Sequence, residues 1–429
     1  MSYPSNVALT YTALATTIGS PGNVFTYTWS FDDGAVGTGA SLTHIWTTTG
    51  PHIATVTATD TTTLGNATTS KLVTIDSYIW SLASSAMPLY VRSPLSGNLD
   101  GNTIISAGGR DNSLNNIKST YIFDGSVWSQ VGDMVNARSS FNNNHPVKLV
   151  KLPNGKMLVA GNNSVTAGVG ISAEIYDPFT QTWSSTGSMS NDRSFNCYPV
   201  LLNDGRVIVY GGQTISAGAT NAYEFYNFNT GTWSNGGTIG NSSDGTIVIP
   251  AMMNDGRVFF ASTANGVSRI FNPTNNSWFT CSSNTLTGGL NNNNVSVICG
   301  VDGNIYLFGY NGSSTNLCGR YNTGSDTWTQ LTAWSSTLNP GVYPFRLGSG
   351  SYILIPGITL PGGNLGSAIY DTSDDAWRMT AQYNIQGTGS LGSTARENGF
   401  GTISGKPIVW CNPGDTTAPY GIPEIFNGV

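Results

Sequence analysis

The sequence has little charge. Only 9% of its 429 residues are Asp, Glu, Lys or Arg, with 17 basic residues against 23 acidic ones. Nucleic-acid backbones are bound by clustered Lys and Arg, and the basic residues here form no cluster or stripe, so we expect no nucleic-acid partner. The sequence also has no apolar run near the ~20 residues that a membrane-spanning helix needs. We therefore expect no membrane insertion.

Cysteines are few, odd in number and widely spaced. They are Cys197, Cys281, Cys299, Cys318 and Cys411, with no CxxC pair among them. This spacing favours buried, reduced thiols over a zinc site or a disulfide framework. The acidic residues follow no EF-hand or nonapeptide calcium pattern. We expect the fold to need no metal or other cofactor.

Two further signals are missing. No segment shows the 3.6-residue apolar period of a helix, and the first residues, MSYPSNVALTYT, have no basic segment followed by an apolar one, as a secretory leader would. The sequence instead has 53 glycines, abundant Asn, Ser and Thr, and 39% hydrophobic residues. That composition supports a folded chain rather than a disordered one. We predict an all-β protein with a neutral surface, as is typical of extracellular or particle-borne proteins.

Residues 1–76 alternate apolar and polar residues between Gly-rich turns, which predicts a small antiparallel sandwich. The stretch YTWSFDDGAVGTGASLTHIWTTTGPHIATVTATD resembles the PKD domain, an immunoglobulin-like sandwich with the signature Trp-x-Phe-Gly-Asp-Gly, His-x-Tyr and Gly-x-Tyr-x-Val. The matching residues are Trp29, Phe31, Asp33, Gly34, His44, Gly50 and Val56. Asp32, Trp46 and His52 depart from the signature. We expect the sandwich fold to be kept and the turn at these residues to differ from that of other PKD domains.

After residue 76, one kind of turn recurs. It is a residue followed by Gly, at Asp100-Gly101, Asn154-Gly155, Asp204-Gly205, Asp255-Gly256, Asp302-Gly303, Ser349-Gly350 and Ser404-Gly405. Such pairs supply the positive φ angles of a two-residue hairpin loop. Seven turns predict seven hairpins.

A tryptophan series has a period near 50 residues. It comprises Trp80, Trp128, Trp183, Trp233, Trp278, Trp328 and Trp377, and five of these follow an aromatic residue by seven positions, as in YDPFTQTW. This period, with four short strands per repeat, predicts a β-propeller whose repeats resemble kelch repeats. The Gly-Gly doublet of that repeat is present only at Gly108-Gly109 and Gly211-Gly212. We expect the series tryptophans to lie in the core.

The ends of the repeat region share a blade, because the first Trp precedes the first turn and the last turn has no Trp after it. The C-terminal PEIFNGV matches the third strand AEIYDPF, and SYIWSL, residues 77–82, matches a fourth strand. We predict a sandwich over 1–76 and a seven-bladed propeller over 77–429, in which residues 77–82 close the C-terminal blade.

Long connections gather on one predicted face of the propeller. Tight turns join strands 1 and 2 and strands 3 and 4 on the opposite face. Because loops on a rigid scaffold usually carry function, we expect recognition at the long-loop face. The candidate ligand contacts there are Arg138, Asn143, His145, Arg193, Tyr310, Trp334, Arg396 and Glu397.

Some of these residues have a structural alternative. Arg138 and Arg193 each follow a Met by four residues, and this repetition favours hydrogen bonding between blades, with ligand contact as the alternative. Three glutamates, Glu174, Glu224 and Glu424, share one register before the third-strand aromatic, and we interpret them as structural.

Enzyme alternatives find little support. Galactose oxidase, which is also a kelch propeller, uses a copper site with two His, whereas this propeller has His145 alone. Sialidases need three converging Arg and a Tyr-Glu pair, which we do not find. A glycosidase would need two carboxylates in range, and Glu397 with Asp133, Asp192 or Asp244 leaves that alternative open.

We therefore expect a non-enzymatic binding protein, extracellular or carried on a virion. The neutral all-β composition resembles bacteriophage virion proteins such as tail fibres, receptor-binding proteins and head decorations. The expected partners are a host-surface glycan or protein at the long-loop face, and other virion proteins at the PKD-like domain. A structural decoration or fibre protein and a secreted adhesin remain alternatives.

Overall fold

Strands make up the described structure. The computed structural model describes residues 2–4, 8–13, 24–48, 50–76, 80–89, 91–140, 148–162, 169–214, 218–241, 248–262, 266–284, 286, 295–310, 316–333, 344–347, 351–359, 365–382, 399–410 and 423–427. Among these residues the helical element is a single 3-10 turn, η1 (Val169–Ile171), so the all-β class is confirmed. The chain forms two compact units. They are Met1–Ile79 with Arg378–Ala381 and Asn427–Val429, and Trp80–Trp377 with Gln382–Phe426.

The N-terminal unit is an immunoglobulin-like sandwich. Its strands are β1 (Ser2–Pro4), β2 (Ala8–Thr12), β3 (Phe25–Phe31), β4 (Val36–Thr38), β5 (Ser41–Ile45), β6 (Gly50–Asp60) and β7 (Asn66–Asp76). One sheet has the order β1-β7-β6-β3-β4 and the other pairs β2 with β5. Alternate residues of β3 and β6 point inward, so Trp29, Phe31 and Val56 are buried with Trp46 between the sheets.

The three departures from the PKD signature lie together. Asp32 Oδ1 is 3.1 Å from Nδ1 of His52, and the His52 ring stacks on Trp46 with a centroid separation of 4.3 Å. The Trp46 indole in turn donates to the hydroxyl of Tyr11 at 2.9 Å. Each unusual residue therefore supplies a partner for another.

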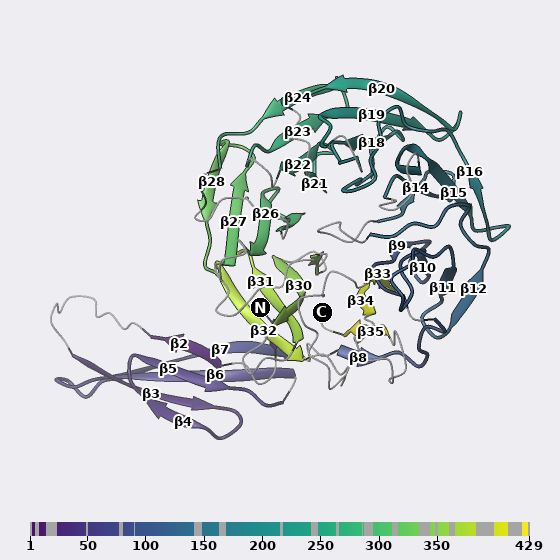
Figure 1. Ribbon diagram of the computed structural model, residues 1–429. Helices are drawn as coiled ribbons and strands as arrows, with labels where there is room; N and C mark the ends of the chain where they lie inside the picture. The colour runs from purple at the N-terminus through teal and green to yellow at the C-terminus, as the bar shows by residue number, and fades with distance from the viewer. Residues whose placement is uncertain are drawn as a thin grey trace. The chain divides into compact units, whose positions relative to one another are not determined.

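The second unit is a ring of seven four-stranded antiparallel sheets, a β-propeller (Figure 1). From the inside outward, the first three blades are β9 (Leu95–Asn98), β10 (Ile104–Ala107), β11 (Thr120–Phe123) and β12 (Trp128–Val131); β13 (Val150–Lys151), β14 (Met157–Ala160), β15 (Ala173–Asp177) and β16 (Thr182–Ser185); and β17 (Val200–Leu201), β18 (Val207–Tyr210), β19 (Ala222–Asn227) and β20 (Thr232–Thr238).

The remaining blades follow the same order. They are β21 (Val248–Met252), β22 (Val258–Ser262), β23 (Arg269–Asn272) and β24 (Ser277–Thr280); β25 (Val295–Cys299), β26 (Ile305–Tyr310), β27 (Asn316–Asn322) and β28 (Thr327–Gln330); β29 (Phe345–Arg346), β30 (Tyr352–Thr359), β31 (Leu365–Asp371) and β32 (Ala376–Gln382); and β33 (Gly399–Ile403), β34 (Lys406–Trp410), β35 (Pro423–Phe426) and β8 (Trp80–Leu82).

The seventh blade confirms the predicted closure. Strand β8 pairs with β35 so that Trp80 lies opposite Phe426, and the amide of Ala83 donates to the carbonyl of Pro423 at 2.7 Å. Its inner strand is joined to blade 1, where the Asn98 amide donates to the Thr402 hydroxyl at 2.8 Å. The two ends of the propeller sequence are thus held in one sheet and no terminal edge of the ring stays open.

The tryptophan series has one structural role. In blades 1–6, the series Trp on the fourth strand contacts an aromatic ring on the third, with centroid separations of 5.0 to 5.3 Å. Trp128 and Trp183 are buried. Trp233, Trp278, Trp328 and Trp377, which lie on the outermost strands of blades 3–6, are only partly buried. The expectation of a core position thus holds fully for two of these six.

Apolar clusters join neighbouring blades. One cluster combines Ile105 of blade 1 with Met157 and Val159 of blade 2, and another combines Phe259 of blade 4 with Val297 of blade 5. A blade buries its hydrophobic faces only against the next blade, so the ring folds as one body. Cys197, Cys281, Cys299 and Cys318 are buried and form no disulfide with another described cysteine, while Cys411 lies outside the described residues. No described helix is long and apolar enough to cross a membrane.

Five of the six recurrent turns that the structure describes differ from the two-residue loops predicted for them, and Ser349-Gly350 lies outside the described residues. At Asp204-Gly205 the loop is longer, because Leu202 N donates to Arg206 O at 2.8 Å, and only the Gly has a positive φ, of 88°. This is a three-residue loop with a left-handed Gly. Ser404-Gly405 does form the two-residue loop, with φ angles of 50° and 76°.

Candidate functional site

The two faces of the propeller differ in the length of their connections. On one face, which we call the turn face, strands 3 and 4 of blades 1–6 are joined by four residues each: 124–127, 178–181, 228–231, 273–276, 323–326 and 372–375. Strands 1 and 2 of the same blades are joined by five residues each, as at 202–206. On the other, the loop-rich face, connections between blades run from nine residues (239–247) to eighteen (132–149).

The loop of blade 1 shows how this face is built. Residues 108–119 join β10 to β11, and Asp111 ties the tip by accepting a hydrogen bond from the Asn115 amide at 2.8 Å. Leu114 lies at the tip with a φ of 64° and 47% of its surface exposed. The loop is therefore a preorganised polar turn that presents one apolar side chain, which is a suitable arrangement for recognition.

The bases of three loops share a left-handed pair. Gly108-Gly109 and Gly211-Gly212 have positive φ angles, and blade 2 has Gly161-Asn162 in the same conformation, with φ angles of 63° and 56°. Asn162 is fully buried, and its amide donates to the carbonyl of Cys197 at 2.7 Å. The doublet is thus present structurally in blade 2, where the sequence pattern of two glycines missed it.

Asn162→Ala is expected to cost about 2 to 4 kcal/mol of unfolding free energy, because it strains a left-handed backbone and leaves Cys197 groups without partners. Asn162→Gly keeps the backbone relaxed and should cost about 1 kcal/mol less. Urea unfolding of both variants measures the difference. If Ala were tolerated as well as Gly, the left-handed backbone would not be the reason for Asn at this position.

Arg138 lies inside the scaffold. It follows blade 1 in sequence and has no exposed surface, and its guanidinium pairs with Glu174 of blade 2 at 3.0 Å. It also donates to Gly161 O at 2.5 Å, while Glu174 accepts a hydrogen bond from the Val135 amide at 2.7 Å. This ion pair fastens the connection between blades 1 and 2.

Arg193 repeats the arrangement one blade later. It is fully buried, pairs with Glu224 of blade 3 at 2.5 Å and donates to Gly211 O at 2.8 Å. Burial alone would raise the pKa of Glu224, but hydrogen bonds from the Ser190 amide and the charge of Arg193 hold that pKa below its usual value. Both arginines are enclosed by their own chain, so they offer no surface to a ligand.

A cavity of about 250 Å³ lies among the inner strands of several blades. Its walls include Val150 of β13, Leu201 of β17, Ile249 and Met252 of β21, Val297 of β25 and Pro344 before β29. Since inner strands of blades 2 to 5, and the residue preceding that of blade 6, all line it, the cavity lies on the propeller axis. Its walls are mainly apolar.

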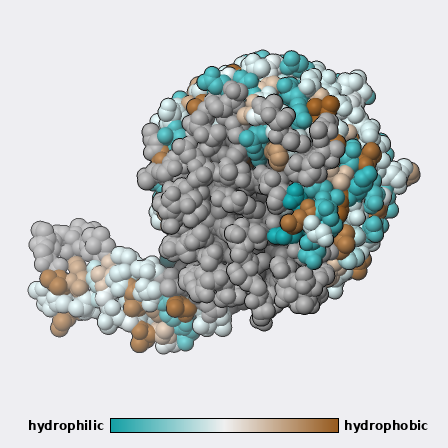
Figure 2. Space-filling model, viewed as in Figure 1, coloured by the Kyte–Doolittle hydropathy of each residue, from teal (hydrophilic) through white to brown (hydrophobic). Residues whose placement is uncertain are grey.

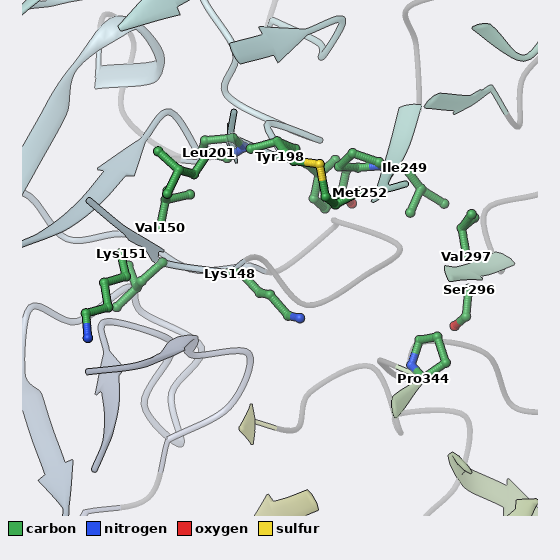
Figure 3. A pocket seen from close by; sticks show the side chains of 14 residues that line it. Lys148, Val150, Lys151, Tyr198, Leu201, Ile249, Met252, Ser296, Val297 and Pro344 are labelled. Atoms are coloured by element: carbon green, nitrogen blue, oxygen red, sulfur yellow. The ribbon is translucent and has the colours of Figure 1, made fainter. Parts of the chain in front are cut away.

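Lys148 extends into this cavity, whereas the side chain of Lys151 points away from it (Figure 3). Lys148 keeps an exposed side chain, and partial desolvation by the neighbouring cavity walls lowers the pKa of Lys148 to about 7. The backbone here is fixed because Leu149 N donates to Ser96 O of blade 1 at 2.8 Å. The backbone from which the Lys148 side chain extends is therefore held in place on the cavity wall.

Most of the other predicted contacts lie outside the described residues. These are Asn143, His145, Trp334, Arg396 and Glu397. Tyr310 is the last residue of β26, at the end of that strand nearest the loop-rich face. The structure therefore brings none of these residues together with Arg138 or Arg193 in a described site.

Lys148 is not among the residues predicted from the sequence, although the repeats carry a signal for it. Lys148, Tyr198, Ile249 and Ser296 each stand six residues before the first residue of their blade's recurrent turn, and all four line the cavity. Aligning the repeats on their turns would have identified this ring of inner-strand positions. It would also have shown a lysine among residues that are otherwise apolar or neutral.

Comparison with known proteins identifies the first unit. Residues 5–75 match the family model of the PKD domain, so the N-terminal sandwich is a PKD domain. A search of curated proteins found no match to the sequence.

Solved structures resemble the propeller. A catalytically inactive virginiamycin B lyase from Staphylococcus aureus with quinupristin superposes with a TM-score of 0.53 at 12% identity, covering 81% of this chain and 99% of that chain. The structure of YjhT has a TM-score of 0.47 at 13% identity, covering 69% and 99%. At such identities the likeness to the lyase concerns the fold alone.

Proposed function

We propose that this chain is a non-enzymatic binding protein whose propeller recognises a carbohydrate or protein through its loop-rich face. The observation that carries the proposal is the difference between the two faces, with connections of four or five residues on one and up to eighteen on the other. A rigid ring that varies its connections on one face only is typical of a recognition scaffold.

The surface chemistry supports a neutral ligand. Figure 2 shows hydrophilic and intermediate residues over the described propeller surface in view, with single hydrophobic residues between them. Amides and hydroxyls of this kind can hydrogen-bond a glycan, and single apolar groups such as Leu114 can pack on the apolar side of a sugar ring. Asn143, His145, Tyr310 and Trp334 remain proposed contacts on this face.

The charged groups support a non-catalytic role. Glu174 and Glu224 are each neutralised by a buried arginine, while Asp204 and Asp255 stabilise tight turns on the opposite face. The acidic residues with described roles therefore act in the scaffold. We further propose that the repeats are of kelch type and that the protein works outside the cell or on a virion, where the PKD domain contacts other structural proteins.

Leu114→Lys is expected to weaken ligand binding at least about tenfold, because it places a charge in a neutral recognition surface. Val127→Lys is the matched control: Val127 lies in a turn-face loop of the same blade and is 48% exposed, against 47% for Leu114. Glycan arrays and host-surface binding identify the ligand, and titration of both variants measures the effect. Equal weakening by both variants, or binding by the isolated PKD domain alone, would favour a spacer role for the propeller.

A further inference from the structure

The larger sheet of the PKD domain has an outer face made mostly of hydroxyl side chains. Its outward positions alternate along β3, β4, β6 and β7, within residues 26–30, 36–38, 53–59 and 66–72, and we call them the hydroxyl face. They carry Thr, Ser and Asn with a few apolar residues, and none of these described positions is charged. Strand pairing aligns them in rows, one of which consists of Thr38, Thr28, Thr57 and Thr68.

The hydroxyl groups of this face bond one another. Thr57 Oγ1 lies 2.8 Å from Thr68 Oγ1, and Thr55 Oγ1 lies 2.8 Å from Ser70 Oγ. A polar group is costly to cover when it loses its hydrogen-bond partner, and these pairs keep theirs across the strands. The methyl groups of the threonines add apolar area to the same surface. Water can therefore be removed from this face at a small cost.

Apolar side chains lie in the same face. Leu72 and Ile53 are cross-strand neighbours with 66% and 45% of their surfaces exposed, and Val36 is 79% exposed. Asp32 follows β3 at the border of the face, and its carboxylate is engaged by His52 at 3.1 Å. A covering surface would thus bury apolar side chains, and no charge within the face would lose its water.

The size and charge of the face suit a second copy of this chain. Strands lie ~4.8 Å apart and rise ~3.3 Å per residue, so four strands over about six residues span roughly 400 Å². Two copies in contact would bury roughly 800 Å² or somewhat more, which is the size of weak and reversible interfaces. The chain has a net charge of −6, so two copies repel each other least where they meet through an uncharged face. An open sheet face also lacks the concave shape that a small ligand needs.

We propose that the hydroxyl face is a self-association surface, through which two copies of this chain pack sheet against sheet in a weak dimer with two-fold symmetry. The inference rests on the PKD domain alone, and it does not depend on recognition at the loop-rich face.

Sedimentation of the full chain measures this association. The weight-average mass is expected to rise by at least about a third between roughly 2 and 200 μM, as suits an interface of this size. The dimer should not weaken when NaCl is raised from about 0.05 to about 0.5 M, because salt screens the repulsion between copies and no charges meet in the contact. A monomer at every concentration, or a dimer that salt dissociates, would overturn the proposal.

Two leucine variants locate the contact. Leu72→Lys places a charge in both halves of a two-fold contact, so it should weaken dimerisation at least about tenfold. Leu64→Lys is the matched control, since Leu64 is 76% exposed in the turn between β6 and β7 and lies outside the hydroxyl face. Melting curves check that both variants fold. Equal association of the two variants would place the contact elsewhere and contradict the proposal.

Mixing oppositely charged variants gives a readout that a loss of folding cannot imitate. Thr57 lies on β6, between β3 and β7 and away from the edges of the face. Thr57→Lys and Thr57→Glu should each stay monomeric, because like charges meet across the two-fold axis. Their equimolar mixture should associate at least about tenfold more tightly than either variant alone. If the mixture stayed as monomeric as its components, the hydroxyl face would not meet its own copy and the proposal would fail.

Discussion

Deleting residues 1–82 is expected to destabilise the propeller by about 3 kcal/mol or more, whereas deleting residues 1–74 should have little effect on it. The longer deletion removes β8, which pairs with β35 through Glu424, Ile425 and Phe426. It exposes the backbone of β35 as an open edge and uncovers Phe426, which is fully buried. The shorter deletion leaves β8 in place.

Calorimetry and tryptophan fluorescence of the two truncated proteins test this closure, with the intact chain as reference. The propeller transition should shift strongly in the longer deletion, and this protein should also aggregate more readily through its open edge. If both truncations melted at the same temperature, β8 would contribute nothing to closure. The same comparison would show whether the PKD domain affects the propeller at all.

Arg193→Met is expected to cost about 3 to 5 kcal/mol, because it leaves the buried carboxylate of Glu224 without its guanidinium partner. Arg257→Met is the control. Arg257 pairs with Asp255 on the turn face, where the two side chains are 33% and 50% exposed, and such surface pairs contribute about 0 to 1 kcal/mol. Urea unfolding at pH 7 compares the two variants.

The contribution of Glu224 should depend on pH in one direction. Its folded-state pKa is lowered, so its stabilisation is fully present above the ordinary carboxyl pKa of about 4.3 and is lost as the pH falls through the lowered value. Glu224→Gln should therefore be most destabilising near neutral pH and approach the unmodified protein in acid. A Glu224→Gln penalty that grew below pH 4 would contradict the assignment.

Short sequence patterns, formed by residues near each other in the chain, predicted much of the fold. Asp204-Gly205 and its counterparts marked the hairpins, and the spacing from Tyr176 to Trp183 marked the third and fourth strands, where the two residues lie directly opposite each other. These features depend on turn geometry and on the two-residue period of strands, which act over a few residues. The match between residues 77–82 and a fourth strand likewise predicted closure.

The positions of the candidate functional residues depend on contacts that only the folded domains create. Arg193 meets Glu224, 31 residues later, only because adjacent blades pack together. Asp32 meets His52 only because β3 and β6 pair in one sheet.

By itself, the sequence determined the seven four-stranded blades, the two kinds of domain and the closing strand, because turn residues and apolar periods act locally. Only the tertiary structure decided that Arg138 and Arg193 are buried rather than available to a ligand. It alone also brought Lys148 together with Met252 and Pro344. Those contacts join residues tens to hundreds of positions apart, and their partners are chosen by the packing of blades around a common axis.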